Sequence, residues 1–192
     1  MTSAHAVALY RKAQLTVGSA QYQELHLISP LLLAQQIKQI VEIEAPVHES
    51  EVTRRLLECY GVNRSGHRIA ATIADAVQIG TDKGLFYALE GFLYVDQRRK
   101  ARVRSRAELN PTERKIEWVA PEEIDEAILD VLRIGLSHPT EDAITDAAER
   151  LGFGRITNRM KEIIRARLDL LLADRRLIQE DTMLSLPVPP HP

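Results

Sequence analysis

The chain has 192 residues and a formal net charge of -2, with 45% hydrophobic and 27% charged residues, a composition typical of a globular protein. It lacks the roughly 18-residue apolar run that a membrane-spanning helix needs, and its amino terminus does not resemble a secretory signal. The single cysteine, Cys59, excludes an internal disulfide, so we expect a cytoplasmic protein with no membrane partner.

Two weakly similar copies of one unit occupy residues 37–95 and residues 128–186. Several equivalent positions carry the same residue: Ile37 and Ile128, Glu58 and Glu149, Gly61 and Gly152, Arg64 and Arg155, and Arg68 and Arg159. A repeat of this length predicts two small modules in place of one large domain. Because each module is too small to bury much surface alone, we expect them to pack on each other or on residues 1–30.

The elements of the first copy follow from apolar spacing and from proline and glycine. A strand over residues 9–17 and a short helix over residues 20–27 precede it. A helix begins at Pro30 and ends before Pro46. Two further helices and a hairpin are predicted over residues 49–60, 65–79, 85–89 and 92–95, with the hairpin turn at Glu90-Gly91.

The second copy predicts the same succession after a possible strand over residues 116–119. Its first helix begins at Pro121, a residue favoured at the first helical position. Thr140 is expected to cap the next helix, and the third helix is predicted over residues 155–173. A hairpin over residues 177–179 and 183–186 completes the copy.

Three helices followed by a hairpin is the winged-helix layout. The predicted fold class is therefore mainly α with small β-hairpins (α+β), arranged as tandem winged-helix or helix-turn-helix-like modules. The predicted divisions are an amino-terminal extension (1–30), a first winged helix (31–97), a connecting segment (98–120), a second winged helix (121–186) and an extended proline-rich tail (187–192).

Charge is unevenly distributed along the chain, which makes the net charge uninformative. Residues 61–106 carry a net charge of +5, and residues 107–151 carry -8. The densest basic run comprises Arg98, Arg99, Lys100, Arg102, Arg104 and Arg106. In an extended segment the alternation from Lys100 places four cations on one edge, about 7 Å apart, close to the phosphate spacing of a nucleic-acid strand. The alternatives are a strip that neutralises an acidic partner and a plain solvated loop.

The third helices would enter a nucleic-acid groove in a winged helix. In the second copy, Asn158, Lys161 and Arg165 share the face opposite the apolar stripe, and Arg155 and Arg159 flank it. The matching positions of the first copy are small or uncharged: His67, Ala70, Ala74 and Gln78. The repeated arginines could serve a shared function or could bond the carbonyl end of the preceding helix.

No pattern of catalytic or cofactor-binding residues is present. The six histidines do not pair with Cys59 at metal-ligand spacing, so we expect no metal, no cofactor and no catalytic residue. A corner formed by Glu42, Glu44, His48 and Glu49 is better explained by helix-end charge and capping than by acid–base work. Cys59 is expected to be a half-buried structural residue.

Three stretches resemble a family of bacterial domains. They are Val41–Arg55, Gly61–Ile69 and Arg114–Ile124. The resemblance is to a family of domains of unknown function at the carboxyl end of large bacterial superfamily-one helicases, which often also carry a restriction-endonuclease-like nuclease domain. It covers about residues 30–186, and Ala45 stands where the family usually has glycine. The resemblance implies a nucleic-acid-processing setting and supplies no catalytic residues.

The sequence thus predicts a non-catalytic accessory module of a bacterial helicase- or nuclease-type protein. Its expected partners are DNA and the helicase or nuclease domains of that protein. The expected DNA contacts are Arg98, Arg99, Lys100, Arg102, Arg104, Arg106, Arg155, Arg159, Lys161 and Arg165. The alternative is a docking or homodimerisation module that binds no nucleic acid.

Overall fold

A computed structural model describes residues 7–15, 24–135 and 137–187. The chain is mainly helical with small sheets, as the α+β prediction states. It divides into two compact units. Residues 11–100 form the first unit, and the residues up to Tyr10 together with those from Ala101 onward form the second unit. Each unit contains one winged helix.

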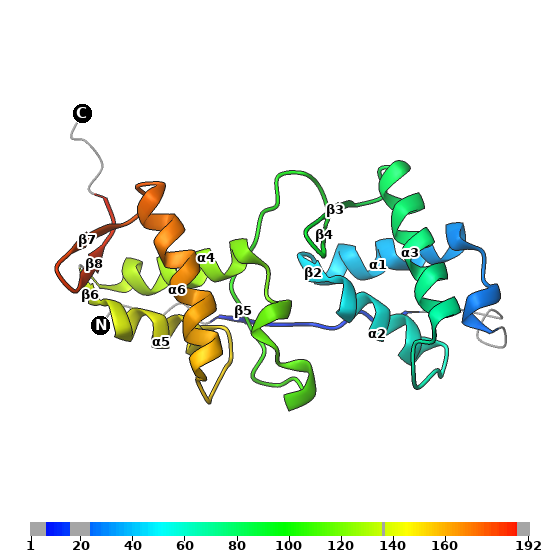
Figure 1. The fold of residues 1–192 in the computed structure, drawn as a ribbon, viewed down its shortest axis with the longest axis horizontal. Helices are drawn as coiled ribbons and strands as arrows, with labels where there is room; N and C mark the ends of the chain where they lie inside the picture. Colours follow the sequence, from blue (N-terminus) through cyan, green and yellow to red (C-terminus); the bar gives the residue numbers. More distant parts are fainter. Residues whose placement is uncertain (1–6, 16–23, 136, 188–192) are drawn as a thin grey trace. The chain divides into compact units, whose positions relative to one another are not determined.

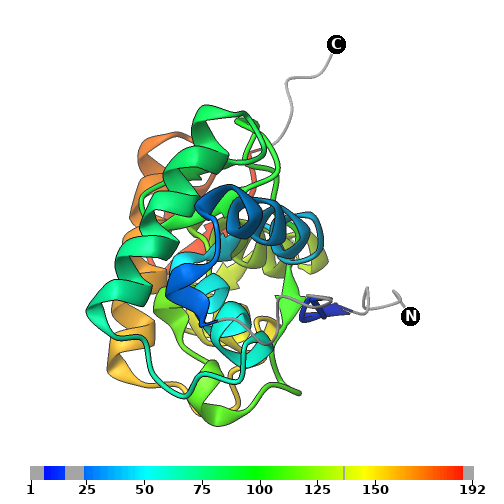
Figure 2. The same cartoon turned by 90° about the vertical axis from the view of Figure 1, so that its right-hand side faces the viewer.

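The first unit packs three helices beside a three-stranded antiparallel sheet with the strand order β2-β4-β3 (Figure 1). Its elements are the short 3-10 helix η2 (Leu25–Leu27), α1 (Pro30–Glu44), β2 (Val47–His48), α2 (Glu49–Cys59), α3 (His67–Asp82), β3 (Tyr87–Leu89) and β4 (Phe92–Tyr94). The central strand β4 aligns Leu93 with both Val47 and Ala88. In Figure 2, the helices α1 to α3 of this unit are coloured blue to green.

The spacing of apolar residues and the positions of proline and glycine explain these elements. Pro30 lies at the start of α1, and Leu33, Ile37 and Ile40 on one face of that helix are fully buried. Gly61, with a φ of 64°, follows α2 in the left-handed conformation that ends a helix. The predicted helix-end role holds for His48, whose Nδ1 accepts a hydrogen bond from the backbone N–H of Ser50.

The second unit contains the same winged helix and an additional parallel strand pair. The pair joins β1 (Ala8–Leu9) to β5 (Arg104–Ser105). The other elements are η3 (Pro111–Glu113), η4 (Ile116–Trp118), α4 (Pro121–Ile134), β6 (His138–Pro139), α5 (Thr140–Arg150), α6 (Asn158–Ala173), β7 (Ile178–Glu180) and β8 (Met183–Ser185). The sheet has the order β6-β8-β7, which repeats the order of the first unit.

The predicted repeat is confirmed by the element bounds. The first helix of the second unit begins at Pro121, 91 residues after Pro30. The helices α2 and α5 both have 11 residues, and α3 and α6 both have 16. The same offset relates all three strands of the two sheets and also η2 to η4, so the repeat begins upstream of the first helix. Residues 91 apart are called equivalent below.

In the second unit, three local predictions were wrong. Residues 116–118 form a 3-10 helix, not a strand. Thr140 is the first residue of α5, not its cap, because its hydroxyl donates to the carbonyl oxygen of Thr182. The helix α6 begins at Asn158, not at Arg155, because the side chain of Thr157 caps it by accepting from the backbone N–H of Met160.

Some predictions fall partly on residues that the structure does not describe. The strand predicted over residues 9–17 was wrong where it is described, because β1 ends at Leu9 and residues 10–15 form no strand; residues 16 and 17 lie outside the described part. In the helix predicted over residues 20–27, the described part is η2, and residues 20–23 lie outside it. Residues 188–192 of the tail also lie outside, and the predicted domain boundaries stay a prediction. Among the described residues, no helix is both long and apolar enough to span a bilayer.

Candidate nucleic-acid interface

The basic run after β4 begins with an exposed loop. Arg98, Arg99 and Lys100 are all exposed. The backbone N–H of Arg98 donates to Oδ1 of Asp96 at 2.8 Å, and Arg99 has a φ of 48°, so the chain turns sharply at this point. The three cations border a surface hollow of about 180 Å³. Its other lining residues are Ala45, Pro46, Tyr94, Val95 and Asp96. This loop therefore presents closely spaced cations next to the wing of the first unit.

Arg104 and Arg106 are held inside the second unit by Glu123. Only 3% of Arg106 is exposed, and its two terminal nitrogens donate to the two carboxylate oxygens of Glu123 at 2.9 Å each. Arg104 binds the same carboxylate through its backbone N–H, Nε and Nη2, at 3.0, 3.2 and 2.6 Å. The predicted row of four exposed cations is therefore wrong for these two residues, and only Arg102 of the later part of the run is exposed.

The arginine pair keeps a fully buried carboxylate ionised. Burial alone would raise the pKa of Glu123, but the charges and hydrogen bonds of Arg106 and Arg104 outweigh it and lower the pKa. Both guanidinium carbons lie 4.8 Å from the ring centroid of Tyr10. The site thus joins the end of β1, β5 and the first turn of α4, and its role is structural.

Two cations on α6 form an exposed face, as predicted. The side chains of Lys161 and Arg165 are 40% and 47% exposed. Both pair with Glu141 of the adjoining helix α5: Lys161 Nζ lies 3.8 Å from Oε2, and Arg165 Nη2 donates to Oε1. The hydrogen bond from Arg165 lowers the pKa of Glu141. Exposed pairs of this kind contribute little to stability, so both cations can exchange Glu141 for a phosphate.

Arg155 and Arg159 extend this face toward the amino-terminal end of α6. The side chain of Arg159 is 65% exposed and lies 3.6 Å from Glu117 and 3.4 Å from Glu162. Arg155 is exposed in the preceding loop. With Asn158, whose exposed position at the start of α6 is also as predicted, these residues gather four cations on one helix and its entry loop.

The equivalent arginines of the first unit, Arg64 and Arg68, are exposed as well. Across the described ranges, no hydrogen bond joins the side chain of Arg64, Arg68, Arg155 or Arg159 to the carbonyl end of a preceding helix, so that explanation of the repeated arginines fails. Arg64 and Arg68 were not among the predicted DNA contacts, and their exposure places two cations in the first unit at positions equivalent to Arg155 and Arg159.

The outward face of α3 contrasts with that of α6. His67, Ala70, Ala74 and Gln78 are exposed, as predicted. The amide of Gln78 donates to Asp82 on the same helix at 2.7 Å. This face is small and almost uncharged, so the two units present different surfaces from equivalent helices.

The described residues offer little for metal or nucleophilic chemistry. Nowhere among them do three or more His, Cys, Asp or Glu side chains gather in a way that could hold a metal ion. Cys59 is half-buried, its Sγ lies 3.7 Å from the carbonyl oxygen of Leu15, and burial raises the pKa of its thiol. A raised pKa keeps the sulfur protonated and weakly nucleophilic.

Comparison with known families gives one match, in the first unit. Residues 23–71 match the model of the family described as "Protein of unknown function (DUF3320)". The matched stretch includes α1, β2 and α2 and ends within α3. No curated protein and no solved structure matches the chain. The chain is thus similar, over part of its first winged helix, to proteins of this family of unknown function.

Proposed function

We propose that the chain is a non-catalytic accessory module that binds DNA through backbone phosphate contacts. The observation that carries the proposal is the cationic face of α6, which is exposed although residues 107–151 of the same unit carry a net charge of -8. The third helix is the element that enters the groove in helix-turn-helix proteins. The proposed contacts are Arg98, Arg99, Lys100, Arg102, Arg155, Arg159, Lys161 and Arg165.

Two features of the cations favour sequence-independent binding. In the described part of the chain, Arg159, Lys161 and Arg165 pair with exposed carboxylates, which a phosphate can replace at little energetic cost. The loop over residues 98–100 follows the wing directly, and its cations border a shallow hollow, not a deep cavity. Phosphate contacts of this type position a protein on DNA without reading its sequence.

The setting of the module is part of the same proposal. We propose that it serves a bacterial helicase- or nuclease-type protein, whose other domains would be its partners and would perform the chemistry. The support is the resemblance of Val41–Arg55 and Arg114–Ile124 to domains that follow helicase cores. The match of residues 23–71 to a family of unknown function is compatible with this setting.

The test is fluorescence anisotropy of labelled single-stranded, duplex and forked DNA with the whole chain at about 50 and 200 mM salt. Neutralising Arg155, Arg159, Lys161 and Arg165 to Gln should weaken binding and reduce the slope of log affinity against log salt by about 0.9 per lost duplex contact. Arg104 and Arg106 are left intact in every variant, because removing them would leave the buried Glu123 unpaired.

A gain of affinity tests the α6 face more sharply. Glu141→Gln removes the carboxylate that competes for Lys161 and Arg165, so DNA should bind about 3- to 10-fold more tightly. Asp142→Asn removes one negative charge from the neighbouring exposed position of α5 and serves as the matched control. Equal gains in the two variants would show that only net charge matters, and no binding at low salt would overturn the proposal in favour of protein docking.

A further inference from the structure

The groove between the first two helices of the first unit holds an extended segment of the chain. The backbone N–H of Ala13 donates to Oε1 of Glu44, at the end of α1, at 2.8 Å. Two residues later, the carbonyl oxygen of Leu15 lies 3.7 Å from Sγ of Cys59, at the end of α2. Ala13 is 7% exposed and belongs to the core, and Leu15 packs against it. An extended segment with a small residue therefore seals this groove.

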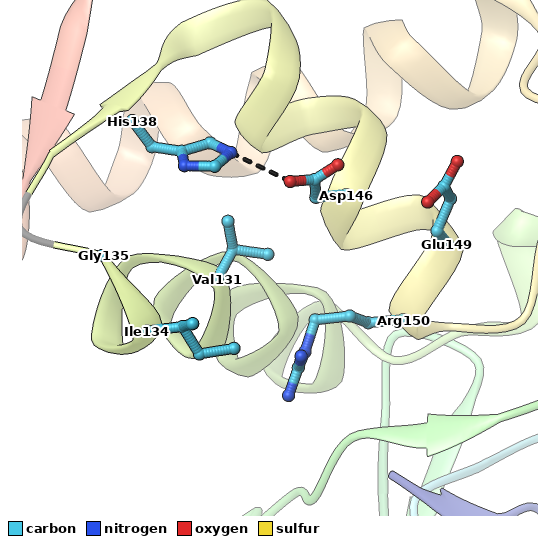
Figure 3. Close-up of a pocket in the computed structure, with 7 residues that line it drawn as sticks. All are labelled: Val131, Ile134, Gly135, His138, Asp146, Glu149 and Arg150. Carbon is cyan, nitrogen blue, oxygen red and sulfur yellow. Dashed lines mark hydrogen bonds and ion pairs between the residues drawn. The ribbon is translucent and has the colours of Figure 1, made fainter. Parts of the chain in front are cut away.

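The equivalent groove of the second unit is hollow. Between α4 and α5 lies a surface cavity of about 540 Å³ (Figure 3). Its lining residues are Val131, Ile134, Gly135, His138, Asp146, Glu149 and Arg150. Gly135 is equivalent to Glu44, and Arg150 is equivalent to Cys59. The two positions that hold Ala13 and Leu15 in the first unit thus form part of the wall of this cavity.

Within the described residues, the chain reaches this groove of the second unit at one end. Arg102 and Val103 line a neighbouring hollow together with Asp130 and Arg150. At the other end Gly135 is exposed, and 44% of the side chain of Asp146 is exposed, whereas Arg55, the equivalent of Asp146, is buried. The cavity is therefore the part of the groove that residues 13–15 cover in the first unit and that no described segment covers in the second unit.

The walls of the cavity favour a basic ligand. Val131 and the exposed Ile134 supply apolar surface on α4. Asp146 and Glu149 project from α5, and Asp146 Oδ2 lies 2.9 Å from His138 Nε2 (Figure 3). The positive charge of Arg150 is directed at Asp130, 3.5 Å from its carboxylate. An apolar floor with two carboxylates at its edge suits a small apolar residue beside a lysine or arginine.

We propose that this cavity binds an extended peptide segment of a partner protein, in which a small apolar residue is adjacent to lysine or arginine. The segment would lie as residues 11–15 lie in the first unit, where Arg11 and Lys12 precede Ala13. Its basic side chain would pair with Asp146 or Glu149, and its small apolar residue would contact Val131 and Ile134. None of the cavity's lining residues is among the proposed DNA contacts, so either proposal can fail without the other.

The probe is a fluorescein-labelled peptide with the sequence Tyr-Arg-Lys-Ala-Gln-Leu, which reproduces residues 10–15. With the whole chain, we expect saturable anisotropy and amide chemical-shift changes at Gly135 and His138. A peptide with Glu in place of Arg and Lys should not bind. Asp146→Arg should weaken binding about 10-fold, while Asp142→Arg, on the same helix outside the cavity, should leave it unchanged.

A gain-of-function variant tests whether the peptide lies as residues 11–15 lie in the first unit. Gly135→Glu restores the carboxylate that accepts the Ala13 N–H in the first unit, and a Cβ at this position meets only Ser137 O at an ordinary 3.6 Å. Binding should tighten about 10-fold, the effect of one hydrogen bond to a charged group. Unchanged shifts at Gly135 and His138 at about 1 mM peptide would overturn the proposal.

Two further outcomes would reassign the cavity to another occupant and so overturn the proposal. If the chain dimerises with rising concentration and Asp146→Arg abolishes this, the occupant is a second copy. If deletion of residues 1–6 strengthens peptide binding, the occupant is the amino terminus of the chain itself.

Discussion

The two winged helices have the same arrangement of helices and strands but different side chains between those helices. Where α1 meets α3, the first unit has two buried alanines, Ala34 and Ala76. The equivalent residues of the second unit, Asp125 and Arg167, form two hydrogen bonds of 2.8 and 2.6 Å. Element bounds are nevertheless shared. The shared arrangement of helices and strands therefore depends on the apolar, proline and glycine positions common to both copies. It tolerates either a small apolar pair or an ion pair at the same helix–helix contact.

The buried charges of the two units also differ in kind. In the first unit Arg55 pairs with Glu44 and Glu51 at 2.9 and 2.8 Å, and the three residues are buried. Burial raises the pKa of Glu51 despite the nearby arginines. In the second unit two arginines share Glu123 and lower its pKa. An excess of carboxylates in one unit and of arginines in the other predicts opposite responses to acid.

The largest difference between the units is expected at the glycine after the second helix. Gly61 and Gly152 both have a left-handed φ, of 64° and 91°. A Cβ on Gly61 meets nothing within 4 Å, so Gly61→Ala should cost about 1 kcal/mol. A Cβ on Gly152 would lie 2.4 Å from the backbone nitrogens of Arg106 and Ala107. Gly152→Ala must displace this segment and should cost about 3 kcal/mol or more.

Urea unfolding followed by tryptophan fluorescence measures this difference. Trp118 is the single tryptophan of the chain and belongs to the second unit, and circular dichroism reports both units. Gly152→Ala should shift the fluorescence transition strongly, and Gly61→Ala should leave it nearly in place. If each substitution lowered the urea midpoint of its own unit by the same amount, the contact of Gly152 with residues 106 and 107 would have no energetic importance.

The stability of the two units is also expected to respond differently to pH. The folded pKa of Glu123 lies below its unfolded value of about 4.3, so its stabilisation is present above that pH and is lost as pH falls toward the folded pKa. The folded pKa of Glu51 lies above its unfolded value, so the first unit becomes more stable as pH falls through that folded pKa. Below about pH 4.5, the second unit should therefore unfold first.

Hydrogen exchange of the whole chain, corrected for intrinsic exchange rates, would follow both units in one sample. Amides of α4 should lose protection in acid before those of α1. Glu51→Gln should remove the acid-induced gain of the first unit and leave the response of the second unit unchanged. Simultaneous loss of protection in both units, with or without this substitution, would contradict the assigned charge centres.

The positions of the helices could be predicted well from the sequence, but the buried ion pairs could not. Apolar spacing together with Pro30, Pro121, Gly61 and Gly152 located the helices, because these signals act within a few residues of one another. The role of Arg106 depends on Glu123, which is distant in sequence and comes close only when β5 packs against the first turn of α4. Local alternation therefore indicated a row of cations where the fold makes an internal ion pair.

The open groove of the second unit was also beyond sequence reasoning. It appears only when Gly135 and Arg150 are compared with Glu44 and Cys59, whose partners are residues 13 and 15. By contrast, the face of Asn158, Lys161 and Arg165 could be predicted, because helical periodicity alone determines which of these positions face outward.

The smallest expected effect concerns the left-handed turn that follows the third helix of each unit. Arg175 follows α6 with a φ of 57°, and the equivalent residue after α3 is Gly84, with a φ of 65°. The left-handed conformation is costly for arginine and free of strain for glycine, so Arg175→Gly should stabilise the second unit by about 0.5–1 kcal/mol. Gly84→Arg should destabilise the first unit by a similar amount, and the urea midpoint reported by Trp118 should shift only for the change at Arg175. Because both positions are exposed, opposite signs can arise only from the backbone turn that the two copies share. Equal signs would mean that the copies end their third helices in different ways.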